Sequence, residues 1–95
     1  EEVHFYATPS NLEVGTHQVH MGGVVVQNSL SRQQSGYTFD VSDGESSVSV
    51  QYQGMLPPIF REGQQVVVVG HQVGQLFQAD RVYAKHDEYY RERPK

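Results

Sequence analysis

The feature that most constrains the fold is a strict two-residue alternation of apolar and polar side chains on both sides of a short turn. Apolar residues occupy every second position over 37–41 and again over 48–52, with polar residues between them. Asp43-Gly44 lies between the two segments, and Gly44 can adopt positive φ. An alternation with this period is typical of strands that are buried on one face. The two segments therefore predict a β-hairpin.

Three further segments have strand character. Residues 17–26 end in a β-branched run after Gly22-Gly23, a pair that permits a strong bend in a first strand. Residues 66–69 are apolar on both faces, as expected of a barrel strand with something packed on its outer side. The chain is expected to turn over 70–74, and residues 76–83 predict the last strand.

Two connections lack this character. Residues 28–36 are rich in Ser, Gln and Asn without any period, which predicts a loop. Residues 54–60 contain Pro57-Pro58, which cannot donate backbone hydrogen bonds, so we expect a short helical turn or a loop there. Five strands with a non-strand element between the third and fourth predict an all-β, partly open Greek-key barrel of the OB type. An SH3-like barrel or a sandwich fragment remains an alternative.

The chain has 95 residues, which suits one domain. We expect an OB-type barrel domain over residues 1–86 and a flexible C-terminal tail over 87–95. A core of this size leaves little room for an internal active site, so ligands are expected to bind on the outside. Cysteine is absent, which excludes disulfides and thiol nucleophiles. No apolar run approaches the ~20 residues of a membrane span.

Charge is distributed unevenly along the chain. Residues 1–80 contain two basic and eight acidic residues, whereas residues 81–95 contain five basic and three acidic ones. An acidic body repels a phosphate backbone, which argues against nucleic-acid binding. No nucleophile elbow or comparable catalytic motif is present, so a hydrolytic enzyme is not indicated.

Histidines are the first candidates for a site. His17 and His20 lie three positions apart in a predicted strand, which places them on opposite faces and favours structural or surface roles over a shared metal ion. A generic metal-binding protein that uses these residues with His4 or His71 remains one alternative. An OB-type module for single-stranded nucleic acid is the other.

His86 has the more informative neighbourhood. It follows the last predicted strand, and Tyr83, Tyr89 and Tyr90 place three phenols within a few residues of it. Acidic residues at 87–88 would raise the pKa of its imidazole and Lys85 would lower it, so the net direction is open. On its own His86 would most often be a surface histidine, but exposed aromatic residues beside it suggest a platform for a ligand.

Tyr90 narrows the choice of ligand. Phenolate is a hard oxygen donor that suits the ferric iron of haem. One helical turn would bring the Cβ atoms of residues 86 and 90 to about 5–6 Å from each other, whereas an extended segment would hold the residues about 13 Å apart. A tail that curls back would therefore contact the edge of a flat ligand through His86 and its centre through Tyr90.

Residues 84–90 closely resemble the signature of the CcmE family, Leu-Ala-Lys-His-Asp-Glu-x-Tyr after the last strand, with Tyr83 in place of the leucine. The resemblance extends over nearly the whole chain. Its other matching positions, in family order, are Phe5-Tyr6, Thr8-Pro9, Gly22-Gly23, Gly54, Leu56-Pro57, Phe60-Arg61-Glu62-Gly63-Gln64 and Gly70.

The resemblance implies specific roles. His86 matches the histidine that bonds covalently to a haem vinyl group, and Tyr90 matches the tyrosine that ligates the haem iron. Phe5, Phe60 and Tyr83 match an apolar haem platform. Tyr89 departs from the family, which commonly has a polar residue there, and it adds a second phenol that competes for the iron.

The resemblance also implies a function. The protein is expected to be a haem chaperone, not an enzyme, that binds haem transiently and covalently and passes it to apocytochrome c. The implied partners are membrane-bound haem-handling proteins and a haem lyase complex. We expect a location on the periplasmic side of the cytoplasmic membrane, with an N-terminal membrane anchor that this sequence does not contain. From charge alone, Arg61 or Lys85 is a candidate to pair with haem propionates.

Overall fold

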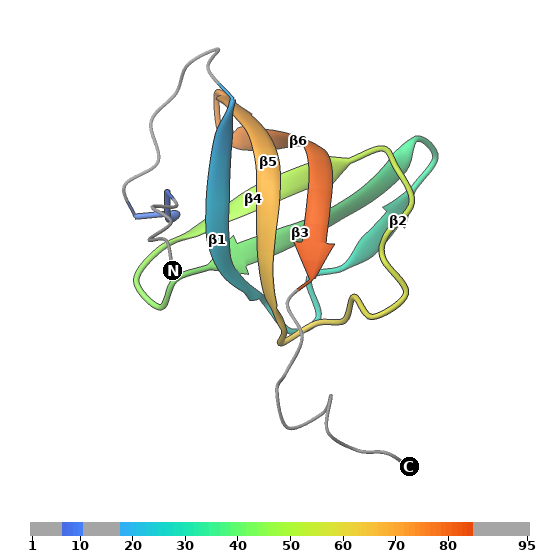
Figure 1. Ribbon diagram of the computed structural model, residues 1–95, viewed down its shortest axis with the longest axis horizontal. Helices are drawn as coiled ribbons and strands as arrows, with labels where there is room; N and C mark the ends of the chain where they lie inside the picture. The colour runs from blue at the N-terminus through green and yellow to red at the C-terminus, as the bar shows by residue number, and fades with distance from the viewer. Residues whose placement is uncertain (1–6, 11–17, 85–95) are drawn as a thin grey trace, which may run out of the picture.

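The computed structural model describes residues 7–10 and 18–84 of the chain. Every regular element in these ranges is a strand, and the strands wrap around one core (Figure 1). The strands are β1 (Val19–Val25), β2 (Ser31–Gln33), β3 (Gly36–Ser42), β4 (Ser47–Tyr52), β5 (Gln65–Val73) and β6 (Leu76–Ala84).

The predicted hairpin is confirmed as β3 and β4. Their antiparallel register runs from Tyr37 opposite Tyr52 to Ser42 opposite Ser47. Gly44 has a φ of +97°, which a residue with a side chain rarely adopts. The apolar positions of the alternation point inward, and Phe39 is 1% exposed. The period seen in the sequence thus sets which face of the hairpin forms the core.

β1 is the strand that closes the barrel. It pairs antiparallel with β5 over Val19–Val24, and at its end Val24 and Val25 pair with β3. A Cβ atom on Gly23 would lie 2.5 Å from Val41 Cγ1 and 2.8 Å from the carbonyl oxygen of Ser42. Only glycine fits here without displacing the hairpin, so the predicted bend coincides with the point of closure.

The strand order β1-β5-β6-β4-β3, completed by the β1–β3 pairing, makes a closed five-stranded barrel. Neighbouring strands are antiparallel except for β4 and β6, which pair in parallel through Ser49–Tyr52 and Leu76–Ala79. This is the topology expected of the OB type, and the predicted fold class is confirmed. The pairing that closes the barrel is short, because β1 meets β3 over two residue pairs.

Two boundaries differ from the sequence prediction. The expected loop over 28–36 contains β2, which extends the hairpin by pairing Ser31–Gln33 with β3 outside the barrel. The expected turn over 70–74 is wrong in part, because β5 continues to Val73. A bulge lies at Gly70, where a Cβ atom would collide with the carbonyl oxygen of Gln78. Gly70 thus allows a close backbone approach, and the turn itself lies at Gly74.

The connection over 53–64 is a loop with turns. The Phe60 amide donates to the Pro57 carbonyl at 3.0 Å, and the Gly63 amide donates to the Val25 carbonyl at 2.7 Å. The first bond closes a turn within the loop, and the second ties the loop to the end of β1 before β5 begins (Figure 1). In the described ranges, no helix has the length and hydrophobicity that crossing a membrane requires.

The core is a layer of inward-pointing aliphatic and aromatic side chains from all five barrel strands. Phe60 contributes from the loop, because its ring lies 5.0 Å from that of Phe39 at an angle of 58°. The buried members are Met21, Val25, Phe39, Val41, Val50, Val66, Val68, Phe77 and Val82.

We predict that Gly23→Ala lowers the free energy of unfolding by about 1–3 kcal/mol, because the added methyl group overpacks the closure between β1 and β3. Urea denaturation checks this. Ser47→Ala, at an exposed position of β4, is the control and should stay within about 0.5 kcal/mol of the parent. Equal stability of the two variants would contradict the role given to Gly23.

Candidate functional site

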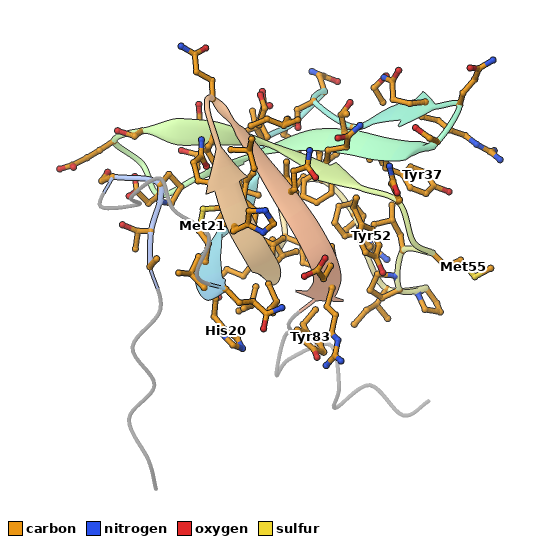
Figure 2. All side chains as sticks on the ribbon, turned by 90° about the horizontal axis from the view of Figure 1, so that it is seen from above. His20, Met21, Tyr37, Tyr52, Met55 and Tyr83 are labelled. Atoms are coloured by element: carbon orange, nitrogen blue, oxygen red, sulfur yellow. The ribbon has the colours of Figure 1, made fainter. Side chains whose placement is uncertain are left out.

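Strands β1, β5 and β6 present a continuous face that points away from the core. Their registers form two rows across it: one joins β1 to β6 through Val69, and the other joins them through Val67. We call this the outer face; its residues are His20, Val69 and Arg81 in the first row, and Gly22, Val67 and Tyr83 in the second. Figure 2 shows His20 and Tyr83 projecting to the same side of the molecule.

Tyr83 is the large apolar group of the outer face that is open to solvent. It is 48% exposed, whereas its neighbour Val67 is 7% exposed and Val69 is 5% exposed. The guanidinium of Arg81 donates to the Tyr83 hydroxyl at 3.3 Å. This hydrogen bond is the main reason why the pKa of Arg81 is raised, followed by the electrostatic interaction with Tyr83 and a smaller contribution from the Asp80 charge. The pair therefore combines an exposed ring with a fixed positive charge.

An open groove of about 890 Å³ adjoins the second row of the outer face. Gly22 and Val67 belong to both, so the groove begins where the Tyr83 row ends at β1. Most of its described lining is backbone, glycine and valine. The other lining residues are Thr8, Gly23, Val24, Val25, Val26, Gln27, Ser42, Asp43, Gly44, Gly63, Gln65 and Val66.

A single carboxylate, that of Asp43, stands among the described residues that line this groove. It accepts hydrogen bonds from the backbone amides of Ser10 at 3.0 Å, Glu45 at 2.9 Å and Ser46 at 3.0 Å. Hydrogen bonding by Ser10, followed by the amides of Ser46 and Glu45, holds the pKa of Asp43 well below its ordinary value. The apolar groove thus carries a fixed negative charge at one side.

The structure describes two of the three predicted platform residues, and their surroundings differ from each other. Tyr83 points out of the barrel from β6, as expected of a surface residue. Phe60 is partly buried and packs on Phe39, so its ring contributes to the core. Phe5, His86 and Tyr90 lie outside the described residues, and their roles stay predictions.

Of the two cations that are candidates for the propionates, the structure describes one. Arg61 is exposed in the loop before β5, where its amide donates to the Gln64 side chain at 3.0 Å, and Lys85 lies outside the described residues. Arg81 was not among the predicted site residues. The signal that would have found it is its position two residues before Tyr83, which puts both side chains on one face of a strand.

The histidines do not form a metal site within the described residues. His20 is exposed on the outer face and His71 lies on β5, and no group of three or more His, Cys, Asp or Glu side chains is close enough there to hold a metal ion. His4 and His17 lie outside these ranges.

A family model described as the CcmE domain matches residues 3–93 of the chain. Curated relatives carry the same name. "Cytochrome c-type biogenesis protein CcmE" of Ehrlichia canis is 38% identical over 94% of this chain and 71% of its own length. The protein of that name from Azotobacter vinelandii is 41% identical over 95% of this chain and 63% of its own. The chain thus spans about two thirds of these relatives.

Solved structures agree on the fold. The solution NMR structure of the OB-fold domain of haem chaperone CcmE from Desulfovibrio vulgaris has a TM-score of 0.64 and 28% identity, and the match covers 73% of this chain and 86% of that one. The telomere capping protein Ten1 from Saccharomyces pombe matches with a TM-score of 0.55 and 17% identity over 73% of this chain and 66% of that one. The second likeness shows the fold alone.

We predict that the Asp43 carboxylate makes the stability of this end of the barrel pH-dependent. A pKa that is lower in the folded than in the unfolded chain stabilises the fold above the unfolded value of about 4, and the effect is lost as pH falls through the folded value. Asp43→Asn should therefore be less stable than the parent at pH 7, and the difference should narrow from pH 5 to pH 2. Thermal unfolding of both proteins across this range is the measurement. A constant difference would contradict the assignment.

Proposed function

The chain belongs to the CcmE family of cytochrome c-type biogenesis proteins, and we propose that it is a haem chaperone that holds haem through His86 and passes it to apocytochrome c. The observation that carries the proposal is the position of Tyr83, an exposed ring on a strand that ends at Ala84. The proposed attachment residue follows that strand end by two positions.

Chain geometry supports a joint role for Tyr83 and His86. Each residue spans at most about 3.3–3.6 Å, so the Cα atom of residue 86 lies within about 7 Å of that of Ala84 in any conformation. β6 is paired with β5 through Ala84, which fixes the starting point of the tail. A ligand bonded to His86 is therefore kept near the Tyr83 ring.

The described surface suits a flat, largely apolar cargo. The Tyr83 ring provides an exposed aromatic face, and the adjoining groove has glycine at positions 22 and 23 and an exposed Val24. Aromatic and aliphatic groups of this kind bind a porphyrin plane by dispersion and by displacing water. Polar groups are sparse between Tyr83 and the groove, so little desolvation opposes binding.

The proposed attachment is an addition reaction. A nitrogen of the neutral His86 imidazole bonds to one vinyl carbon and the carbon–carbon double bond becomes single. The other vinyl carbon takes up a proton, and the imidazole gives up its own N–H proton, so the substituted ring is neutral again. Atoms and charges balance without an added oxidant, and the reverse elimination returns both groups unchanged. A carrier needs this reversibility because it must release the haem chemically unchanged, whereas an enzyme converts its substrate to a product.

Tyr90 is proposed to bind the iron. Its phenolate is a hard oxygen donor that favours the ferric over the ferrous ion. The strength of this contact then depends on the oxidation state of the iron, whereas the bond to His86 does not. We assign the partners by family: membrane proteins that deliver haem and a haem lyase complex that receives it. By the same family resemblance, the domain would lie on the periplasmic side of the cytoplasmic membrane, held there by an N-terminal anchor.

We predict that His86→Ala abolishes covalently held haem and leaves reversible binding. The parent, co-expressed with a cytochrome c maturation system, should retain haem through acid–acetone extraction and gain the mass of one haem on the peptide that contains His86. The variant should gain none, yet still give a Soret band when haem is added. Extraction-resistant haem in the variant would overturn the proposal.

Two adjacent tyrosines offer a matched pair for the iron ligand. Tyr90→Phe should shift the ferric spectrum and leave the ferrous spectrum nearly unchanged, because phenolate binds ferric iron preferentially. Tyr89→Phe is the control and should match the parent in both states. A spectral change in the Tyr89 variant alone would move the ligand by one position.

A further inference from the structure

We propose that Arg81 binds a propionate of the haem and thereby orients the porphyrin on the outer face, with its vinyl edge toward His86. This inference rests on the proposed function and assigns a role to a residue outside the attachment and iron-binding positions. Arg61 and Lys85 are the other candidates, which were expected from charge alone.

Arg81, Tyr83 and the end of the strand follow one another along β6. Arg81 and Tyr83 point to the same side of the strand, about 7 Å apart at their Cα atoms, and Ala84, the last residue of β6, follows them. Tyr83 therefore stands between the guanidinium and the proposed attachment residue. A porphyrin that lies on the Tyr83 ring would have one edge over Arg81 and the opposite edge near the proposed attachment to residue 86.

Haem chemistry supplies the next step. Protohaem carries its two vinyl groups on one half of the ring and its two propionates on the other. Bonding a vinyl group to the side chain at position 86 therefore sends the propionates away from the tail. On the described surface, that direction leads along β6 to Arg81, whose planar guanidinium matches a carboxylate in shape and charge.

Charge on both sides of the Tyr83 row supports this orientation. The groove beyond the row carries the Asp43 carboxylate, whose low pKa keeps it ionised at neutral pH, and it repels a propionate. On the other side, Arg81 donates to Tyr83 but not to a carboxylate at salt-bridge distance among the described interactions. Its neighbour Asp80 already accepts a hydrogen bond from Gln18 at 3.1 Å. The guanidinium therefore retains donors for a ligand.

Arg32 provides a matched control. It is also exposed, and it pairs across β2 and β3 with another tyrosine, Tyr37. The two arginines thus share a residue type, exposure and a tyrosine neighbour. In the strand order, however, β2 is separated from β6 by β3 and β4, so Arg32 lies away from the outer face.

The test compares ferric haem with its dimethyl ester, in which both propionates are neutral, by Soret titration in the absence of covalent attachment. We expect Arg81→Gln to weaken haem binding about fivefold, as loss of a solvent-exposed ion pair does, and to leave ester binding unchanged. Arg32→Gln and Arg61→Gln should bind both porphyrins as the parent does. Thermal unfolding should show no change in Arg81→Gln, because the side chain is exposed.

Three results would overturn the inference: unchanged haem affinity in Arg81→Gln, equal losses for haem and ester, or a selective loss in Arg61→Gln instead. Rising ionic strength gives an independent check, since it should weaken parent binding to haem more than to the ester. Failure of the proposed function appears differently, as parent protein that gives no Soret band with either porphyrin, and it removes the inference as well.

Discussion

The double pairing of β1 is the constraint on which the rest of the structure depends. One strand must run antiparallel to β5 and then turn far enough to reach β3, and Gly23 permits this because Val41 and the Ser42 carbonyl occupy the space that a side chain would need. Closure holds β1, β5 and β6 side by side in one wall of the barrel. The outer face and the groove beside it follow from that arrangement.

Much of this fold is predictable because alternation reports burial directly. The hairpin, the last strand and the barrel class come from the period of apolar residues over a few segments. β2 was missed because all three of its residues are exposed and polar, so pairing leaves no hydrophobic pattern. Gly70 was misread as a turn because glycine serves two purposes: here it lets two backbones approach at a bulge, which depends on a partner strand distant in sequence.

The candidate site also combines residues that a local motif predicts with residues whose position depends on the fold. His86 and Tyr90 are predicted from a local motif and lie outside the described residues, so their roles stay predictions; Tyr83 is exposed. Phe60 also packs on Phe39, and that contact could not be read from a local motif because it depends on how the loop returns to the core. The groove and the fixed charge of Asp43 were not predictable, because they arise where a turn, β1 and the start of β5 converge. Arg81 was overlooked although its spacing from Tyr83 was visible.

The parallel pairing of β4 and β6 has a mechanical consequence. β6 is hydrogen-bonded on one edge to β5 along its whole length and on the other to β4 at its beginning, so it is anchored in the middle of the sheet. Amide protons that β6 donates into these pairings are protected from exchange with solvent while the pairings hold. Tension applied at the C-terminal end of β6 is therefore carried first by its pairing with β5, and nearer the beginning of the strand by its pairing with β4 as well.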